Sequence, residues 1–182
     1  TPVWWDDLWL NESFAEYMGN RVAAAVTTYD DAWDQLAWTR RQWGLMADQA
    51  PSTHPVAGNG AEDAAAALQD FDGISYSKGS SILKQLAARL GDEVFFAGVI
   101  DHFERNRYGN ATMHDLFASW ERAGAGDLSS FADAWLRVSG VDEIRFDRAD
   151  GVLNRVAPAS GSEPREHHTS LARWRSSASE WA

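Results

Sequence analysis

The sequence predicts a mainly α-helical protein that carries one short β-hairpin near its C-terminal end. Over most of residues 6–138, apolar residues recur every three or four positions, which is the spacing of a buried helix face. Further along, Ile144 and Phe146 alternate with polar residues, and Asp150-Gly151 is a hairpin turn signal. The chain has 182 residues, of which 45% are hydrophobic and 24% are charged, as is usual for a globular protein with a sizeable core.

Two helices are expected in the first fifty residues. Asp6 and Asp7 have the chemistry of N-cap residues and predict a helix that runs to about Val26. Asp30 and Asp31 offer a second helix start. The apolar positions of the first helix include Leu8, Trp9, Ala15 and Val22, and those of the second are Trp33, Leu36, Ala37 and Trp43.

A long connection is expected from Ala50 to Gly73, because prolines and glycines interrupt it around a short Ala-rich turn. Four helical runs with apolar stripes follow. They cover residues 78–90, which Gly91 ends, residues 92–107, a helix that begins at Thr112 with Asp115 as a variant capping box, and residues 128–138.

The chain therefore divides into three expected parts. Residues 1–139 form a helical part, and residues 140–157 form a hairpin that begins a β domain. Residues 158–182 are rich in Ser and Arg with almost no apolar periodicity, so we expect a disordered polar tail.

Composition excludes several classes of function. With 16 basic and 27 acidic residues the net charge is −11, so neither a nucleic acid nor an anionic membrane is an expected partner. The absence of Cys excludes a disulfide scaffold and a thiol nucleophile. The start at Thr1 is neither a signal peptide nor an initiator Met, and it suggests the interior of a longer protein. We expect a cytoplasmic monomer.

Glu12 is the most informative single position. On a helix its neighbours one turn away are Leu8, Trp9, Ala15 and Glu16, so no cation lies within a turn of it. A carboxylate buried without a partner is costly. Glu12 therefore needs either a Lys or Arg from another element or a metal ion, unless it is simply a solvated acid.

The segment from Trp4 to Ala15, WWDDLWLNESFA, closely resembles the third-ligand segment of the aminopeptidase N (membrane alanyl aminopeptidase) family of gluzincin zinc metallopeptidases. In that family a His-Glu-x-x-His helix supplies two zinc ligands and a Glu on a later helix completes the site. The resemblance identifies Glu12 as that Glu. It also implies that the His-Glu-x-x-His helix lies upstream of Thr1, because only eleven residues precede Glu12.

A second segment, FDGISYSKG from Phe71 to Gly79, resembles the family segment that carries a catalytic tyrosine, which corresponds to Tyr76. A phenol near zinc can donate a hydrogen bond to the oxyanion that forms when water attacks a peptide carbonyl. The Thr53-His54-Pro55 loop also matches the family. The resemblance covers the chain from Thr1 to about Ala157.

Other polar residues are weaker candidates. Glu16 lies one turn after Glu12 and could accept the free N–H of a zinc-bound His and so orient that ring, or it could be a surface acid that pairs with Arg21 or solvent. Lys78 is expected to be structural, and Asp72 is expected to cap or stabilise its loop. None of the five histidines belongs to a His-Glu-x-x-His segment; they are His54, His102, His114, His167 and His168.

The resemblance implies the helical C-terminal half of a thermolysin-like catalytic domain, followed by the hairpin that opens the next domain. It further implies an aminopeptidase that removes N-terminal amino acids from peptides with one Zn²⁺ ion, and a chain that is inactive without the upstream histidines. Peptides with a free N-terminus would be the partners. The alternative is a non-catalytic helical module that binds a protein through exposed Trp side chains. If the resemblance holds, Glu12 lies mid-helix and faces the same cleft as Tyr76.

Overall fold

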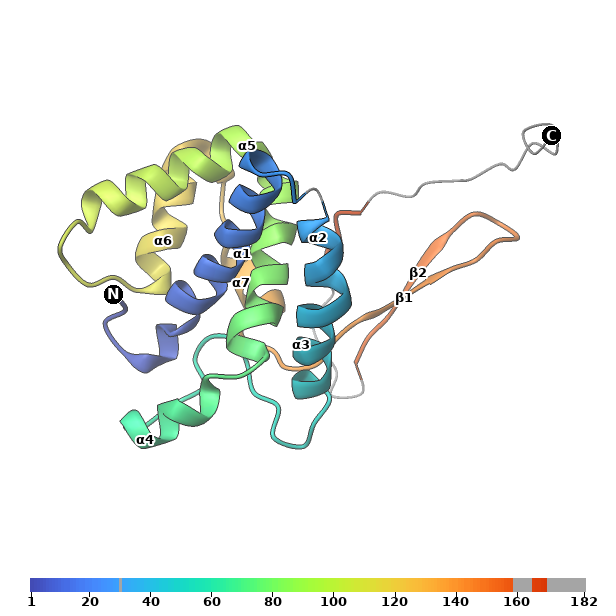
Figure 1. The fold of residues 1–182 in the computed structure, drawn as a ribbon, viewed down its shortest axis with the longest axis horizontal. Helices are drawn as coiled ribbons and strands as arrows, with labels where there is room; N and C mark the ends of the chain where they lie inside the picture. The colour runs from blue at the N-terminus through green and yellow to red at the C-terminus, as the bar shows by residue number, and fades with distance from the viewer. Residues whose placement is uncertain (30, 159–164, 170–182) are drawn as a thin grey trace.

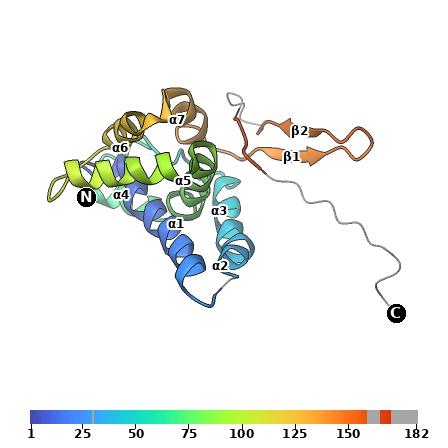
Figure 2. The ribbon, with the colours of Figure 1, turned by 90° about the horizontal axis from the view of Figure 1, so that it is seen from above.

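The computed structural model describes residues 1–29, 31–158 and 165–169, and it shows a packed group of helices from which one β-hairpin projects (Figure 1). A view from above shows the hairpin standing beside the helices rather than over them (Figure 2). The predicted mainly α fold with a small antiparallel sheet is confirmed. Within the described ranges, no helix has both the length and the apolar character that crossing a membrane requires.

Helix α1 (Trp9–Val26) follows a short 3₁₀ turn (Trp5–Asp7). The predicted capping by Asp6 is wrong, because its Oδ1 instead accepts a hydrogen bond from the Gly60 N–H at 3.0 Å. Leu8 and Trp9 are buried as predicted, whereas Ala15 and Val22 are exposed. The reason is the helical period, since the buried face of α1 repeats every four residues through Trp9, Ser13 and Tyr17.

The second helical run is continuous but has a wider turn in its middle. Helix α2 (Ala32–Gln35) leads into the π-helical turn η2 (Leu36–Arg40) and then into α3 (Arg41–Asp48). Leu36 is buried as predicted, but Ala37 and Trp43 are exposed. A π turn shifts the residues after it relative to a regular helix, so a stripe read with one period fails there.

The long connection contains the predicted Ala-rich turn, α4 (Ala64–Ala67), and a 3₁₀ turn, η3 (Leu68–Asp70). A second π turn, η4 (Ile74–Lys78), leads into α5 (Gly79–Arg105), which Gly91 interrupts at a φ of +75° as its residue type predicts. The predicted capping box at Thr112 opens α6 (Met113–Trp120). The turn η5 (Glu121–Ala125) and helix α7 (Ser129–Trp135) complete the helices.

The core lies where α1, α5, α6 and α7 meet, and large aromatic side chains dominate it. The Phe95 ring lies 5.6 Å from Tyr17 and 5.4 Å from Trp120, measured between centroids. Gly98 permits this packing, since a Cβ there would lie 2.1 Å from Trp120 Cδ1. Trp9 and Trp120 therefore serve helix packing, and Trp33 and Trp135 pack against the same core.

Strands β1 (Glu143–Phe146) and β2 (Leu153–Val156) form the predicted hairpin, and Glu143 pairs with Val156. Ile144 and Phe146 stay 40% and 49% exposed, so the hairpin buries neither face against the helices. Of the expected disordered tail, the structure describes only residues 165–169 beyond residue 158, and there Arg165 is buried and donates to the Ala134 carbonyl at 2.8 Å. The remaining tail residues lie outside the described ranges.

Candidate active site

The close approach of α1 to η4 and α5 brings the two motif segments together. The buried Ser13 hydroxyl on α1 donates to the Ser75 carbonyl on η4 at 2.6 Å. Gly79 permits this contact, because a Cβ at this position would lie 1.9 Å from Ser13 Oγ. Residues next to Ser13 and Ser75 therefore share one small region, although they are about sixty positions apart in the sequence.

Glu12 and Tyr76 lie side by side in this region. Burial raises the pKa of Tyr76 to about 12, and a hydrogen bond to Glu12 and the negative charge of that carboxylate add to the effect. The expected proximity of the two side chains is therefore present. The expected mid-helix position is wrong, since Glu12 belongs to the first turn of α1 and is half-buried.

Glu12 differs from Glu16, the half-buried acid one turn later on the same helix, in its surroundings. Within the described residues it makes no ion pair with a Lys, Arg or His side chain. A carboxylate with this exposure and a phenol as its neighbour retains free lone pairs for a cation from outside the chain. One oxygen donor of this kind suits a zinc ion as one ligand of several.

Glu16 has partners that the sequence did not reveal. Its side chain is 7% exposed, and its Oε2 accepts from Arg40 Nε at 3.0 Å and from Arg40 Nη2 at 2.5 Å. Its Oε1 accepts from the Ser77 hydroxyl at 2.8 Å. Arg21 instead pairs with Asp92, so the hypothesis of a surface acid paired with Arg21 is wrong.

Arg40 and Trp43 frame the Tyr76 ring. The Trp43 ring lies 5.9 Å from the Tyr76 ring, and the Arg40 guanidinium lies 4.5 Å above Trp43 and 6.0 Å from the Tyr76 centroid. Arg40 ends the π turn η2 and Tyr76 is the middle residue of the π turn η4. Sequence reasoning missed Arg40, because its contacts join segments that lie far apart in the sequence. Arg40 and Tyr76 both belong to π turns, which often occur at functional sites.

Lys78 and Asp72 have the roles that the sequence suggested. Lys78 Nζ lies 2.8 Å from Asp48 Oδ2 and donates to the carbonyls of Val138 and Gly140 at 3.3 Å each. Burial lowers the pKa of Lys78 despite the charge of Asp48, which fits a structural lysine. Asp72 Oδ1 accepts from the Ile74 N–H at 2.8 Å and so caps the start of η4.

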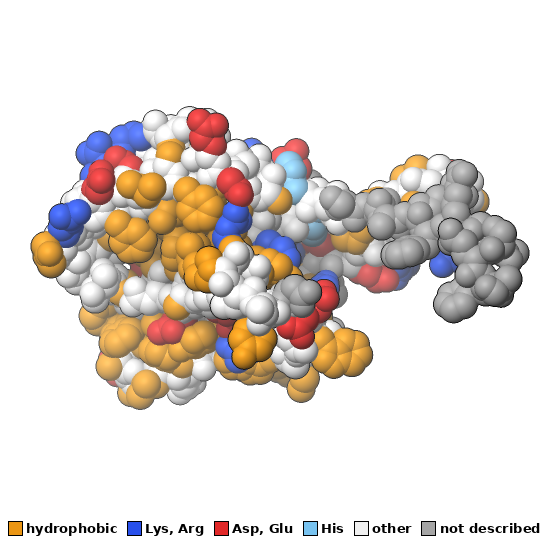
Figure 3. All heavy atoms as spheres, turned by 45° about the horizontal axis from the view of Figure 1, so that its top comes forward, with side chains coloured by type: hydrophobic (Ala, Val, Ile, Leu, Met, Phe, Trp, Pro, Cys, Tyr) orange, Lys and Arg blue, Asp and Glu red, His pale blue; other side chains and the backbone are white. Residues whose placement is uncertain are grey.

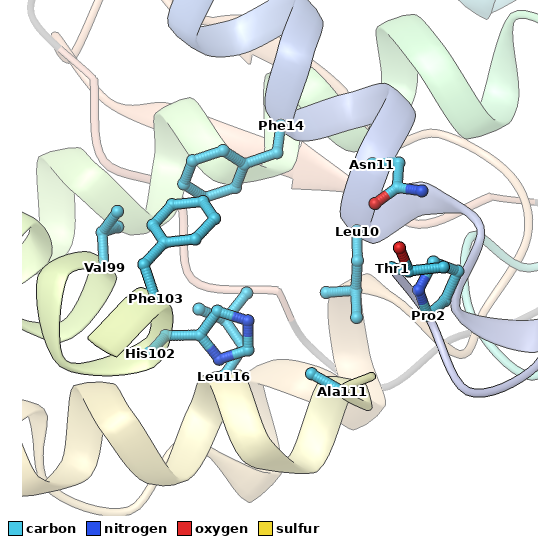
Figure 4. Close-up of a pocket in the computed structure, with 10 residues that line it drawn as sticks. All are labelled: Thr1, Pro2, Leu10, Asn11, Phe14, Val99, His102, Phe103, Ala111 and Leu116. Carbon is cyan, nitrogen blue, oxygen red and sulfur yellow. The ribbon is translucent and has the colours of Figure 1, made fainter. Parts of the chain in front are cut away.

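Two hollows of the surface lie away from Glu12 and Tyr76. A cavity of about 60 Å³ opens between α1, α5 and α6, where Phe14, His102 and Phe103 point toward it (Figure 4). A shallower depression of about 660 Å³ adjoins the C-terminal end of α5. Neither is lined by Glu12 or Tyr76. Among residues 1–29, 31–158 and 165–169, no group of three or more His, Cys, Asp or Glu side chains could by itself hold a metal ion.

The surface bears on the alternative of a Trp-based interaction module. Apolar side chains are spread among charged ones on the face seen in Figure 3. Trp38 on η2 is 80% exposed, whereas Trp9 and Trp120 are almost completely buried. Trp38 is thus available to a partner, whereas Trp9 and Trp120 serve the packing of the core.

Comparison with known proteins adds independent information on this arrangement. Residues 1–135 match the model of the Peptidase family M1 domain. This range contains both Glu12 and Tyr76, together with Arg40 and Trp43.

Individual relatives agree with that match. Aminopeptidase N of Streptomyces lividans is 40% identical over 162 residues, which cover 86% of this chain and 19% of the relative. Leucyl aminopeptidase of Saccharolobus solfataricus is 34% identical over 80% of this chain and 18% of its own length. Alanine/arginine aminopeptidase of Saccharomyces cerevisiae is 36% identical over 75% of this chain and 16% of its own length. The chain thus spans about a fifth of the length of these curated relatives.

Proposed function

The chain belongs to peptidase family M1, and from that premise we propose that it is part of a zinc-dependent aminopeptidase that removes N-terminal amino acids from peptides. The predicted resemblance to the aminopeptidase N family is confirmed by these matches. The observation that carries the proposal is the contact between Glu12, a carboxylate that makes no ion pair within the described residues, and the phenol of Tyr76. Each residue lies in a segment that the family motif predicts.

Glu12 is proposed as one of three protein ligands to a zinc ion. The observed surroundings support this role, since the side chain is half-buried and makes no ion pair within the described residues. The other two ligands would be histidines from a segment upstream of Thr1 in a longer protein. When bound, the zinc ion would polarise a water molecule and the substrate carbonyl. The chain alone, with one ligand, is proposed to be inactive.

Tyr76 is proposed as the donor to the oxyanion that develops on the scissile carbonyl. With a pKa of about 12, its hydroxyl keeps its proton at neutral pH and can donate a hydrogen bond. The Trp43 ring at 5.9 Å and the guanidinium of Arg40 limit the orientations of the phenol. Restricting the donor before the reaction avoids reorganisation when charge develops.

Glu16 is proposed to orient a zinc-bound His without binding the metal itself. Oε1 accepts only from Ser77 among the described residues, so a lone pair remains for the N–H of a zinc-bound His. Arg40 neutralises the Glu16 charge and keeps this carboxylate from competing with Glu12 for the metal. Peptides with a free N-terminus would be the substrates, and we propose a cytoplasmic monomer.

Kinetics of the longer enzyme test these roles. Tyr76→Phe keeps the ring and removes only the hydroxyl, so turnover should fall about a hundredfold or more while KM and zinc content change little. Glu12→Gln should lower both zinc content and turnover. Rates on an aminoacyl-anilide, with metal analysis in parallel, separate the two. A Tyr76→Phe enzyme with turnover within a few-fold of the parent would make Tyr76 a packing residue.

A further inference from the structure

His54 lies in the long connection between α3 and η4, where two carboxylates approach its ring. Its Nδ1 lies 2.7 Å from the Pro55 carbonyl oxygen, and its side chain is only 15% exposed. Its buried Nε2 lies 3.4 Å from Asp72 Oδ2 and 3.6 Å from Asp70 Oδ1. These Nε2 distances are too long for ordinary hydrogen bonds but short enough for ion pairs. Charge, more than a directional hydrogen bond, therefore links His54 to the two carboxylates.

Asp72 connects His54 to the turn that carries Tyr76. While its Oδ2 faces His54, its Oδ1 accepts from the N–H groups of Ile74 and Ser75 at 2.8 and 3.2 Å. The Asp72 carbonyl also accepts from the Tyr76 N–H at 3.2 Å. Both the side chain and the backbone of Asp72 thus fix the first turn of η4.

Asp70 is held in the same group. Its Oδ2 accepts from the Asn59 side chain at 2.7 Å, which ties an earlier part of the connection to the residues just before η4. With one imidazole between two carboxylates, the group is closest to charge balance when His54 carries a proton on each ring nitrogen. A neutral imidazole would leave two partly buried carboxylates repelling each other.

We propose that His54 is a positioning residue of the site, whose imidazolium fixes Asp72 and thereby the turn that presents Tyr76. This inference deepens the proposed function and rests on it for the catalytic consequence. The structural part, a histidine that orders η4 through Asp72, stands on the contacts alone.

The ionisation of the group supports this role. Burial lowers the pKa of His54, but the nearby Asp72 carboxylate, the Pro55 carbonyl and the charge of Asp70 outweigh it and raise the pKa. For Asp72, burial raises the pKa, while His54 and the N–H groups of Ile74 and Ser75 lower it overall. Burial, together with the charges of Asp72 and Asp6, raises the pKa of Asp70 despite His54.

The sign of the pH dependence follows from these directions. A histidine with a raised pKa in the folded state contributes stability that is complete below about pH 6.5 and is lost as pH rises through the folded pKa. Asp72, with a lowered pKa, contributes stability that is lost as pH falls through its own folded value. Asp70 has the opposite sign: its pKa is raised, so the folded state disfavours its ionised form, and its contribution to stability decreases as the pH rises. The turn should therefore be most ordered in mildly acidic solution.

Amide exchange in this chain tests the inference without zinc or substrate. NMR should place the His54 titration above its ordinary value. After correction for the intrinsic exchange rate, the protection of the Ile74 and Ser75 amides should fall several-fold as the pH rises through this titration. His54→Gln should give low protection that no longer depends on pH. Asp72→Asn keeps an acceptor for the two amides and should return the His54 pKa toward its ordinary value.

His102→Gln is the matched control, because His102 lies on α5 and burial lowers its pKa. This variant should keep the pH dependence at Ile74 and Ser75. Protection that is constant with pH in the unaltered chain, or a His54 pKa at or below the ordinary value, would overturn the inference. Because the unaltered chain gives this result, poor folding of a variant cannot obscure it.

Kinetics of the longer enzyme separate this inference from the function of Tyr76. His54→Gln should lower kcat about tenfold at mildly acidic pH with KM nearly constant, and it should remove the decline of kcat through the His54 titration. If Tyr76→Phe lowers turnover but His54→Gln does not, the positioning role is overturned and the proposed function stands. If Tyr76→Phe has no effect while the exchange results hold, the proposed role of Tyr76 fails and the ordering role of His54 stands.

Discussion

The charged groups on the two sides of the turn η4 differ in whether they have a partner of opposite charge. On one side, Lys78 meets the carboxylate of Asp48 and two backbone carbonyls, and Asp48 also accepts from the Thr53 hydroxyl and the Gly140 N–H. On the other side, Tyr76 meets Glu12, which makes no ion pair within the described residues. Positions two apart in a helical turn do not share a face, so one short segment serves both regions.

The difference separates a structural ion pair from an incomplete site. A buried charge that has found its partners in the same chain holds two elements together. A half-buried carboxylate that has no cation among the described residues, next to a phenol with a raised pKa, keeps lone pairs free for a partner from outside the chain. The charges on the Lys78 side are therefore paired within this chain, whereas we propose that the Glu12 side is one wall of a site. The variants below test that contrast.

Loss of the Lys78 charge should have the largest effect on stability. Lys78→Met leaves the fully buried Asp48 carboxylate without its cation, and breaking a buried pair in this way costs about 3–5 kcal/mol. Urea denaturation of the chain measures the change. The double variant Lys78→Met with Asp48→Asn should recover part of the loss, because no unpaired charge remains. A loss below about 1 kcal/mol for Lys78→Met would mean that this side is no better paired than the other.

The elements that were predictable from sequence are those whose cause is local. The capping box at Thr112 depends on residues three apart, the break at Gly91 on the freedom of glycine, and the hairpin on alternation with a turn signal at Asp150-Gly151. The packing of Glu12 beside Tyr76 is not local. Its prediction came from the resemblance of two segments to one family.

The parts that sequence reasoning missed depend on contacts between distant segments. Asp6 has the chemistry of an N-cap, but a glycine N–H more than fifty residues later takes its carboxylate. Arg40, the last residue of the π turn η2, reaches Glu16 on another helix, and no pattern in the sequence predicts that contact. His54 gains its importance from Asp70 and Asp72, which a loop brings back to it.

Gly79→Ala should have an intermediate effect on stability, because Gly79 lies where α1 packs against η4, which carries both Lys78 and Tyr76. The new Cβ would lie 1.9 Å from Ser13 Oγ, which the Ser75 carbonyl holds at 2.6 Å, so overpacking should cost about 1–3 kcal/mol in urea denaturation. Gly19→Ala is the matched control on α1, where nothing lies within 4 Å, and it should stabilise by about 0.5–1 kcal/mol. Equal effects at the two glycines would show that the close approach of α1 is not as tight as described.

The smallest effects on stability should come from substitutions of Glu12 and Glu16 on α1. These two variants directly compare an acid that has an ion pair with one that has none within the described residues. Glu16→Gln weakens two hydrogen bonds from Arg40 but keeps a carbonyl acceptor, so it should cost about 1 kcal/mol. Glu12→Gln removes a charge that has no cation within the described residues and keeps a carbonyl acceptor for the Tyr76 hydroxyl, so it should change stability by less than about 0.5 kcal/mol. Parallel urea denaturation of this chain measures both. If Glu12→Gln proved as costly as Glu16→Gln, the Glu12 charge would already have a cation as its partner in this chain. The distinction between Glu12 and Glu16 would then disappear.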